Sequence, residues 1–228
     1  MAVSTRNNIV TNGLVLYLDA ANLKSYVSGS TTWSDMSGNG NNGTLVSGSG
    51  YSNQNGGAIT FDGVNDYVNC GNSATLNLNQ HSICFWFYPK QDATKELIYK
   101  ASSTNSSPGP YEVFQFVGNR IYYRLNANST PNTTQTGTIP FILNTWQYIC
   151  ATYDNITMKT YINTTLDINA PFTTTLTNST GVLNIGAYTD AQYAVLANIA
   201  SVQIYNRALS AQEILQNYNA TKTRFNLT

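Results

Sequence analysis

Short apolar runs separated by turn-forming residues recur along most of the chain and predict β-strands. The first run is Leu14–Asp19, after the turn signal Asn12-Gly13. The other isolated runs are Ala58–Phe61, Tyr67–Val68, Ser82–Tyr88, Glu96–Lys100, Leu183–Ile185 and Ile199–Tyr205. We expect Glu96–Lys100 to neighbour Ser82–Tyr88 in the fold, and Asp62-Gly63 to be a hairpin-type turn.

Two pairs of runs have the pattern of β-hairpins. Glu112–Phe116 and Ile121–Leu125 flank Gly118-Asn119. Trp146–Tyr153 and Met158–Ile162 flank Asp154-Asn155 in the same way. Gly and Asn or Asp tolerate the backbone angles of tight turns, so each pair predicts two antiparallel neighbours.

Near the C-terminus, one segment has the pattern of a helix. Ser210 is placed as an N-cap and Glu213 follows three residues later, which predicts a capping box, and Ile214, Leu215 and Tyr218 give an apolar stripe. About ten strands and one short helix predict an all-β sandwich. No shift in composition marks an internal boundary, so we expect one domain over 12–220, an N-terminal arm at 1–11 and a C-terminal tail at 221–228.

The composition is unusually poor in charge. Only 10% of the 228 residues are charged, with 11 basic and 11 acidic side chains, where soluble domains average about 25%. Asn and Thr dominate instead and favour turns and strands. Scattered Lys and Arg argue against nucleic acid as a partner, no apolar run is long enough for membrane insertion, and the N-terminus lacks the apolar core of a secretory signal peptide.

Residues that could perform catalysis are scarce. Of the three glutamates, Glu213 belongs to the capping box, and Glu96 and Glu112 could face each other across neighbouring strands. A catalytic carboxyl pair is the less favoured interpretation of those two. We expect the single histidine, His81, to be a surface or edge residue. The chain is therefore predicted not to be an enzyme.

A Gly- and Asn-rich loop offers a candidate calcium site. Asp35, Ser37, Asn39 and Asn41 place oxygen ligands at alternating positions, with Gly40 at a sharp turn. The twelfth position is Val46 rather than the bidentate Glu of a calcium loop. An ordinary Asx-rich turn is the alternative. Calcium is the one cofactor that the residues offer.

Cysteines and tyrosines supply the remaining candidates. Cys84 and Cys150 lie on two predicted strands and could form a disulfide if those strands are adjacent, or could remain two buried thiols, with Cys70 left over. Tyrosine presents an apolar face with a polar tip, which suits stacking on sugar rings. Among 16 tyrosines, those expected in loops are the better ligand candidates: Tyr51, Tyr111, Tyr188 and Tyr193.

Four segments together resemble a known family: Gly13–Ala20, Trp33–Leu45, Phe61–Val68 and Ile199–Ile214. They are similar to the opening and the close of a laminin-G-like domain of the concanavalin A-like lectin/glucanase superfamily. The resemblance implies a jelly roll of two curved antiparallel sheets. Cys84 and Cys150 occupy places similar to the paired cysteines of the pentraxin branch. Of the acidic calcium loop of pentraxins only Asp190 is retained, and the catalytic glutamate strand of the glucanases is absent.

The leading hypothesis is a non-enzymatic, lectin-like binding module that recognises glycan or another cell-surface polymer. Its candidate ligand-binding residues are Tyr51, Tyr111, Tyr188, Asp190 and Tyr193. Low charge in an extracellular family without a signal peptide favours a viral or phage structural protein on the particle surface, in contact with other virion proteins and with itself. The alternative is a purely architectural capsid or tail decoration protein, and a divergent glycoside hydrolase ranks third.

Overall fold

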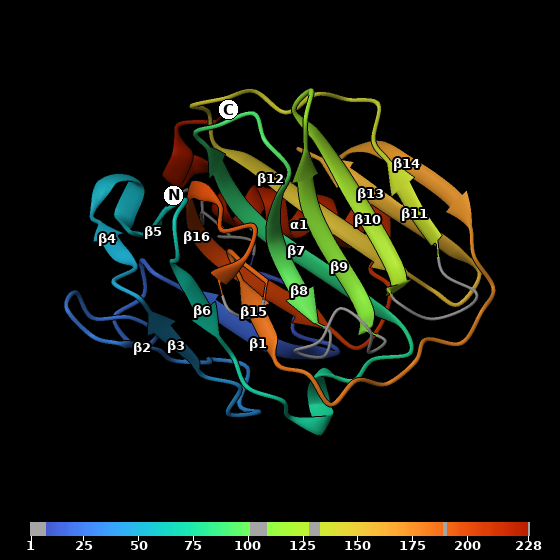
Figure 1. Ribbon diagram of the computed structural model, residues 1–228, viewed down its shortest axis with the longest axis horizontal. Coiled ribbons are helices and arrows are strands. Elements are labelled where there is room, and N and C mark those ends of the chain that lie inside the picture. The colour runs from blue at the N-terminus through green and yellow to red at the C-terminus, as the bar shows by residue number, and fades with distance from the viewer. Residues whose placement is uncertain (1–7, 101–108, 128–132, 189–190, 228) are drawn as a thin grey trace, which may run out of the picture.

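The computed structural model describes residues 8–100, 109–127, 133–188 and 191–227, which form two eight-stranded antiparallel sheets packed face to face (Figure 1). Sheet A has the order β14-β13-β12-β7-β16-β5-β4, and β1 pairs with β16. Sheet B has the order β11-β10-β9-β8-β15-β6-β3-β2. The predicted all-β jelly-roll sandwich is confirmed.

The strands of sheet A are β1 (Leu14–Asp19), β4 (Gly50–Ser52), β5 (Ala58–Asp62), β7 (His81–Pro89), β12 (Gln147–Tyr153), β13 (Thr157–Ile162), β14 (Thr165–Pro171) and β16 (Leu196–Tyr205). Those of sheet B are β2 (Thr32–Trp33), β3 (Gly43–Val46), β6 (Tyr67–Asn69), β8 (Lys95–Lys100), β9 (Gly109–Phe116), β10 (Arg120–Ala127), β11 (Thr133–Thr136) and β15 (Leu183–Ile185). The helices are α1 (Ala211–Thr221) and the short 3₁₀ turns η1 (Gln54–Gly56), η2 (Ala74–Leu76) and η4 (Lys222–Phe225). No described helix has the length and apolar character needed to cross a membrane.

The core lies between the sheets and is built by alternation along each strand. In β7, for example, Ile83, Phe85 and Phe87 point inward and are fully buried. Side chains of a strand alternate between its two faces, so every second residue of the facing strands contributes to the same core. Both predicted hairpins are confirmed, as β9 with β10 and β12 with β13.

Two predicted pairings are wrong. β7 pairs with β12 and β16 in sheet A, whereas β8 pairs with β9 and β15 in sheet B. β5 and β6 likewise belong to different sheets, and Asp62 accepts the backbone N–H of Val64 in the turn between them. Alternation tells which face of a strand is buried but not which sheet the strand joins, so these two sandwich crossings look like hairpins in the sequence.

His81 was expected at the surface or an edge, and this expectation is wrong. The side chain is fully buried between the sheets, where its ring contacts Tyr111, Tyr123 and Tyr153. Its Nε2 lies 2.6 Å from the hydroxyl of Tyr123. Burial lowers the pKa of His81 to about 3, so the ring is neutral in the folded chain.

The outer face of sheet A is covered by the C-terminal segment. Trp86 of β7 contacts Tyr218 of α1 and Phe225 of η4 with ring centroids 5.6 Å and 4.2 Å apart. The predicted capping box is confirmed, since Ser210 and Glu213 exchange side-chain to backbone hydrogen bonds. Cys84 lies directly opposite Cys150 in the β7–β12 register, and a disulfide joins them, with an S–S distance of 2.11 Å.

Three buried groups tie the chain ends to this face. The hydroxyl of Tyr205 donates to the carbonyl of Val10 at 3.0 Å, and the Asn217 amide donates to the same hydroxyl at 3.0 Å. The Val10 N–H in turn donates to Asn217 Oδ1 at 2.8 Å. The network therefore links the N-terminal segment, the last strand and α1 with every member paired.

We predict that Tyr205→Phe destabilises the fold by about 1–3 kcal/mol, because the Val10 carbonyl and the Asn217 amide are left buried without this partner. This corresponds to a fall in the thermal midpoint of several degrees, measurable by calorimetry. The matched control is Tyr88→Phe on the same face of sheet A, whose hydroxyl makes no hydrogen bond within the described residues and whose ring contacts Trp146. Equal midpoints for the two variants would contradict the role of this network.

Candidate functional site

The outer face of sheet B carries a row of polar and aromatic side chains across all eight strands. On β9, β10 and β15 both strand neighbours of the residue in this row belong to the core between the sheets, so the residue points outward, and directly paired residues on neighbouring strands share its face. The register pairs them in order as Thr134, Arg124, Glu112, Tyr99, Asn184, Asn69, Thr44 and Thr32. We call this set the polar row. α1 lies behind sheet A, on the opposite side of the molecule (Figure 1).

A buried carboxyl pair lies at the centre of this face. Glu112 in β9 accepts a hydrogen bond from Arg124 Nη1 at 3.0 Å, and its side chain is fully buried. Glu96 in β8 is also buried and lies close enough for the charge of Glu112 to act on it. Two carboxyl groups therefore share the single guanidinium of Arg124.

Burial sets the protonation of this pair. Desolvation raises the pKa of Glu112 to about 7, although Arg124 acts in the opposite direction. Desolvation and then the charge of Glu112 raise the pKa of Glu96 well above its usual range. Because two like charges in one buried place repel, the pair holds a proton at neutral pH.

Several buried polar atoms of this face have no hydrogen-bond partner within the described structure. They are Glu96 Oε2, Glu112 Oε1 and both amide atoms of Asn184. Asn184 is only 1% exposed although its strand neighbours Leu183 and Ile185 fill the core on the other side. Native structures pair nearly all such groups, so each unpaired group calls for an explanation, of which a bound partner is one.

A cluster of three tyrosines borders the carboxyl pair. Tyr188 lies between Tyr99 and Tyr193, with ring centroids 4.2 Å and 5.3 Å away. The Glu96 N–H donates to the carbonyl of Tyr193 at 3.0 Å, which fixes this tyrosine beside β8. Burial, followed by the charges of Glu112 and Glu96, raises the pKa of Tyr188, so its hydroxyl keeps its proton.

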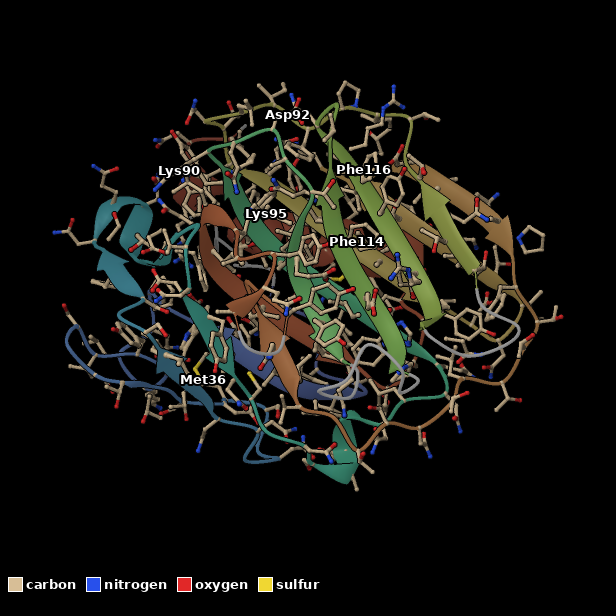
Figure 2. The ribbon with its side chains drawn as sticks, viewed as in Figure 1. Met36, Lys90, Asp92, Lys95, Phe114 and Phe116 are labelled. Atoms are coloured by element: carbon tan, nitrogen blue, oxygen red, sulfur yellow. A yellow bond between two sulfur atoms is a disulfide. The ribbon has the colours of Figure 1, made fainter. Side chains whose placement is uncertain are left out.

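Further aromatic rings continue the face across β9 and β10. Tyr122 contacts Phe114 and Phe116 with centroids 5.0 Å and 4.3 Å away. The guanidinium of Arg124 lies 5.1 Å from the centroid of Phe114, a cation–π distance. Figure 2 shows Phe114 and Phe116 on the side of sheet B that faces the viewer.

The structure brings two of the predicted ligand-binding residues together and separates the others. Tyr188 and Tyr193 share the cluster above, while Asp190 lies outside the described residues. Tyr111 is a wrong prediction as a loop residue: β9 already includes it, its side chain is fully buried between the sheets, and its hydroxyl donates to the Leu76 carbonyl at 3.0 Å. Tyr51 belongs to β4 of sheet A, where its half-buried ring contacts Tyr26.

Sequence reasoning missed the buried floor of this face. Tyr99, Arg124 and Asn184 carried no recognised motif. Asn184 had one signal, since it is the polar centre of the apolar run Leu183–Ile185. Glu96 and Glu112 do lie on neighbouring strands, but the register places Glu112 opposite Tyr99 and Glu96 opposite Phe114, so the two carboxyls are diagonal neighbours.

The candidate calcium residues are engaged in hydrogen bonds of the loop itself. Asp35 Oδ1 accepts the N–H groups of Tyr17 and Ser37, and its Oδ2 accepts the Ser37 hydroxyl and the Asn41 N–H. Asn39 and Asn41 donate to the free edge of β1, at the carbonyls of Leu14 and Val15. Calcium needs six to eight oxygen ligands, and here the one carboxylate is saturated with donors. The donor set fits the Asx-turn alternative rather than a cation.

The two packed antiparallel sheets define a jelly-roll β-sandwich. Residues 61–215 match the family described as the concanavalin A-like lectin/glucanases superfamily, a laminin-G family, and the chain belongs to it. No curated protein matches the sequence.

Solved structures with the same fold include toxin domains and sialidases. The chain is similar to the binding domain of Paraclostridial Mosquitocidal Protein 1 (TM-score 0.73, 15% identity, covering 91% of this chain and 52% of that chain). It is similar to the receptor-binding domain of botulinum neurotoxin type G (TM-score 0.67, 19% identity, covering 91% of this chain and 51% of that chain). It is also similar to a mutant of Trypanosoma rangeli sialidase displaying trans-sialidase activity (TM-score 0.71, 12% identity, covering 95% of this chain and 34% of that chain). This chain thus spans about half of each toxin domain and about a third of the sialidase. At these identities the likeness establishes the fold.

We predict that the carboxyl pair makes the fold less stable as pH rises. A glutamate whose pKa is raised in the folded state binds protons that the unfolded chain has released, so stability falls from the usual glutamate range through about 7, the raised value for Glu112. Glu96→Gln, which keeps the Arg124–Glu112 pair, is expected to flatten the fall in thermal midpoint between about pH 6.5 and pH 8. His81 cannot produce this fall, because its lowered pKa in the fold makes stability rise, not fall, as pH passes the ordinary histidine range.

Glu213 provides the control for this measurement. Its hydrogen bonds from Arg207 lower its pKa to about 2, so its stabilising effect is lost only as pH falls toward that value. Glu213→Gln is therefore expected to leave the slope between about pH 6.5 and pH 8 unchanged. A parent slope preserved in Glu96→Gln would show that the buried pair does not titrate as described.

We predict that the Asp35 loop stabilises the fold without calcium. Addition of calcium or of a chelator is expected to leave the thermal midpoint unchanged, because a ligand of the native state alone would raise it. Asp35→Ala is expected to lower the midpoint equally in calcium and in chelator, since four donors lose their acceptor. A midpoint that rises with calcium in the parent and not in Asp35→Ala would establish a cation site.

Proposed function

We propose that this protein is a non-enzymatic, lectin-like binding module that binds glycan or another hydroxylated cell-surface polymer on the outer face of sheet B. The observation that carries the proposal is the set of unpartnered buried groups of Glu96, Glu112 and Asn184 beside the tyrosine cluster. Sugar hydroxyls both donate and accept hydrogen bonds, so they match a carboxylic acid, a carboxylate and an amide placed together.

The surrounding rings support the same class of ligand. Tyr193 is 49% exposed and Tyr188 is partly exposed next to it. Aromatic faces stack on the C–H faces of sugars while neighbouring polar groups bind the hydroxyls. The polar row continues from the pair to both edges of sheet B, so an extended polymer has contacts beyond one sugar unit.

We further propose exposure on a viral or phage particle, with other virion proteins and copies of this chain as neighbours. The chain has equal numbers of acidic and basic residues, and neutral surfaces rich in Tyr and Asn do not repel one another. The toxin domains with this fold are binding or receptor-binding domains, which agrees with a recognition role for the module.

The architectural alternative rests on the aromatic rings of Phe114, Phe116 and Tyr122 on the outer face of sheet B. Phe116 and Tyr122 are partly exposed beside Phe114, and such rings are common at the centres of protein interfaces. The hypothesis of a divergent glycoside hydrolase rests on Glu96 and Glu112. Acid/base chemistry on a sugar also uses a pair of carboxyl groups, one of them with a raised pKa.

We predict that Tyr193→Ala abolishes binding on a glycan array and that Tyr193→Phe retains it, because the exposed ring supplies stacking and the hydroxyl makes no hydrogen bond within the described residues. Asn184→Ala is expected to weaken binding at least tenfold, the effect of losing about 1.4 kcal/mol. Circular dichroism checks that each variant is folded.

Two outcomes would overturn the glycan proposal. A blank array together with a capsid or tail protein that co-purifies, and is lost in Tyr122→Ala, would establish the architectural function. Turnover of a glycan that Glu112→Gln abolishes would establish an enzyme.

A further inference from the structure

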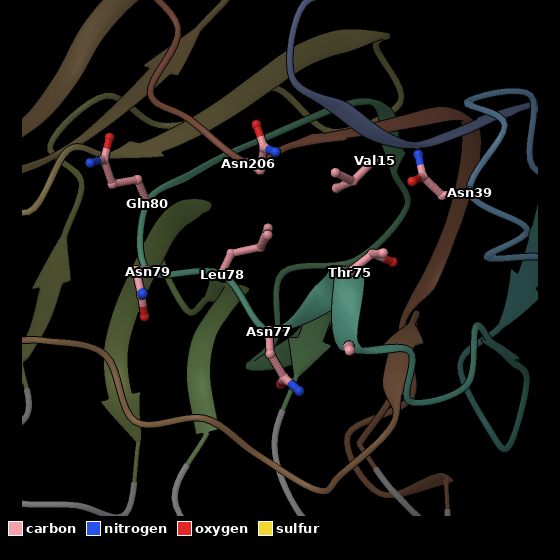
Figure 3. Close-up of a pocket in the computed structure, with 9 residues that line it drawn as sticks. Val15, Asn39, Thr75, Asn77, Leu78, Asn79, Gln80 and Asn206 are labelled. Atoms are coloured by element: carbon pink, nitrogen blue, oxygen red, sulfur yellow. The ribbon is translucent and has the colours of Figure 1, made fainter.

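We propose a second ligand site, separate from the outer face of sheet B, in a groove of about 490 Å³ at the rim of the sandwich. Figure 3 shows this groove between the start of β1, the end of β16 and the segment that leads from η2 into β7. The residues that line it are Val15, Asn39, Ala74, Thr75, Asn77, Leu78, Asn79, Gln80 and Asn206. Its volume falls within the usual range of small-molecule sites, roughly 300–1,000 Å³.

The lining is neutral and rich in amides. Five of the side chains are carboxamides and one is a hydroxyl, and none of the described lining residues is charged. Val15 and Leu78, each 6% exposed, form an apolar floor, and Leu78 lies in the middle of the polar side chains in Figure 3. A patch with these properties pairs an apolar surface with groups that both donate and accept hydrogen bonds.

Several of these amides are available to a ligand. The side chains of Asn79, Gln80 and Asn206 are exposed and make no hydrogen bond to other described residues. In Figure 3 they surround the groove from different segments, with Gln80 and Asn206 on one side of Leu78 and Asn79 on the other. A ligand in the groove could therefore contact amides of two elements that are far apart in the sequence.

The walls are held in place before any ligand arrives. Asn41 is buried and its amide donates both to the Val15 carbonyl at 2.8 Å and to the Thr75 hydroxyl at 2.9 Å. Asn39 is fixed by donation to the Leu14 carbonyl at 3.3 Å. The loop 35–41 therefore connects β1 to η2 and sets the width of the groove, so binding does not require ordering of these walls.

This chemistry selects a neutral polyhydroxylated ligand, such as an oligosaccharide. Without a cation among the described lining residues, the groove offers no charge to phosphate, sulfate or carboxylate groups. Those lining residues include no carboxylate either, so they offer no set of ligands for a metal ion. An apolar ligand would desolvate the amides without replacing their hydrogen bonds. Because none of the described lining residues is aromatic, we expect millimolar affinity for a single short oligosaccharide.

The site can be tested by NMR titration of the isotope-labelled full chain with three neutral probes, cellotetraose, maltotetraose and fully N-acetylated chitotetraose. We expect at least one of them to shift the side-chain NH₂ signals of Asn79, Gln80 and Asn206. Asn79→Ala combined with Asn206→Ala is expected to raise the dissociation constant at least tenfold. Asn65→Ala, an exposed asparagine in the β5–β6 turn, is the matched control and is expected to leave it unchanged.

The outcomes separate this site from the sheet face. Shifts at the groove that persist in Tyr193→Ala support the rim site whether or not the sheet face binds glycan. Shifts confined to the residues of sheet B, or none with any of the three probes, overturn the rim site. Inorganic sulfate is the charged control, and shifts of the groove amides by sulfate would overturn the neutral class of ligand.

Discussion

Trp86 and Trp146 lie on the outer face of sheet A, where the ring of Phe225 packs against both, with centroids 4.2 Å and 4.7 Å away. This contact seals one side of the sandwich, because α1 and η4 cover the aromatic outer residues of β7 and β12. Arg224 completes the seal by pairing with Asp19 at 2.7 Å. With sheet A buried on both faces here, the outer face of sheet B is the broad strand surface on which polar and aromatic side chains can meet a partner.

The few acidic side chains of this chain have structural roles that their hydrogen bonds show. Every aspartate in the described part of the chain accepts a backbone N–H: Asp19, Asp35, Asp62, Asp66, Asp92, Asp154 and Asp167. These bonds shape turns and loops, as short acidic side chains commonly do. Glu213 caps α1. Glu96 and Glu112 differ from these in accepting no backbone N–H among the described residues. Burial raises their pKa values, and Glu96 Oε2 and Glu112 Oε1 have no partner there.

The sequence predicted elements better than it predicted their arrangement. Alternation and turn residues located the two hairpins, the helix with its cap and the apolar strands, since each is a local property. The short or polar strands β2, β3, β4, β11 and β14 were missed, because they carry no apolar run. The mistaken pairing of β7 with β8 arose because the chain crosses between sheets after Pro89, and the choice of sheet depends on long-range packing. The residues of the candidate site divide in the same way, into those found from local sequence and those that depend on long-range packing. Tyr188 and Tyr193 were found as loop tyrosines, whereas Tyr111 and Asn184 could be judged only once the start of β9 and the neighbours of β15 were known.

The two proposed sites follow from the same distribution of charge and differ in one physical respect. The carboxylate of Asp35, in the loop beside the groove, accepts backbone hydrogen bonds. The groove therefore presents amides, whose hydrogen bonding does not change with pH. The sheet face instead contains Glu96 and Glu112, whose pKa values burial raises, for Glu112 to about 7, so that the hydrogen-bonding role of Glu112 changes near neutral pH. A protonated carboxyl donates a hydrogen bond to a sugar hydroxyl, and its ionised form can only accept one. The binding proposed on the sheet face is therefore expected to depend on pH near neutrality, whereas the binding proposed at the rim is expected to be independent of pH.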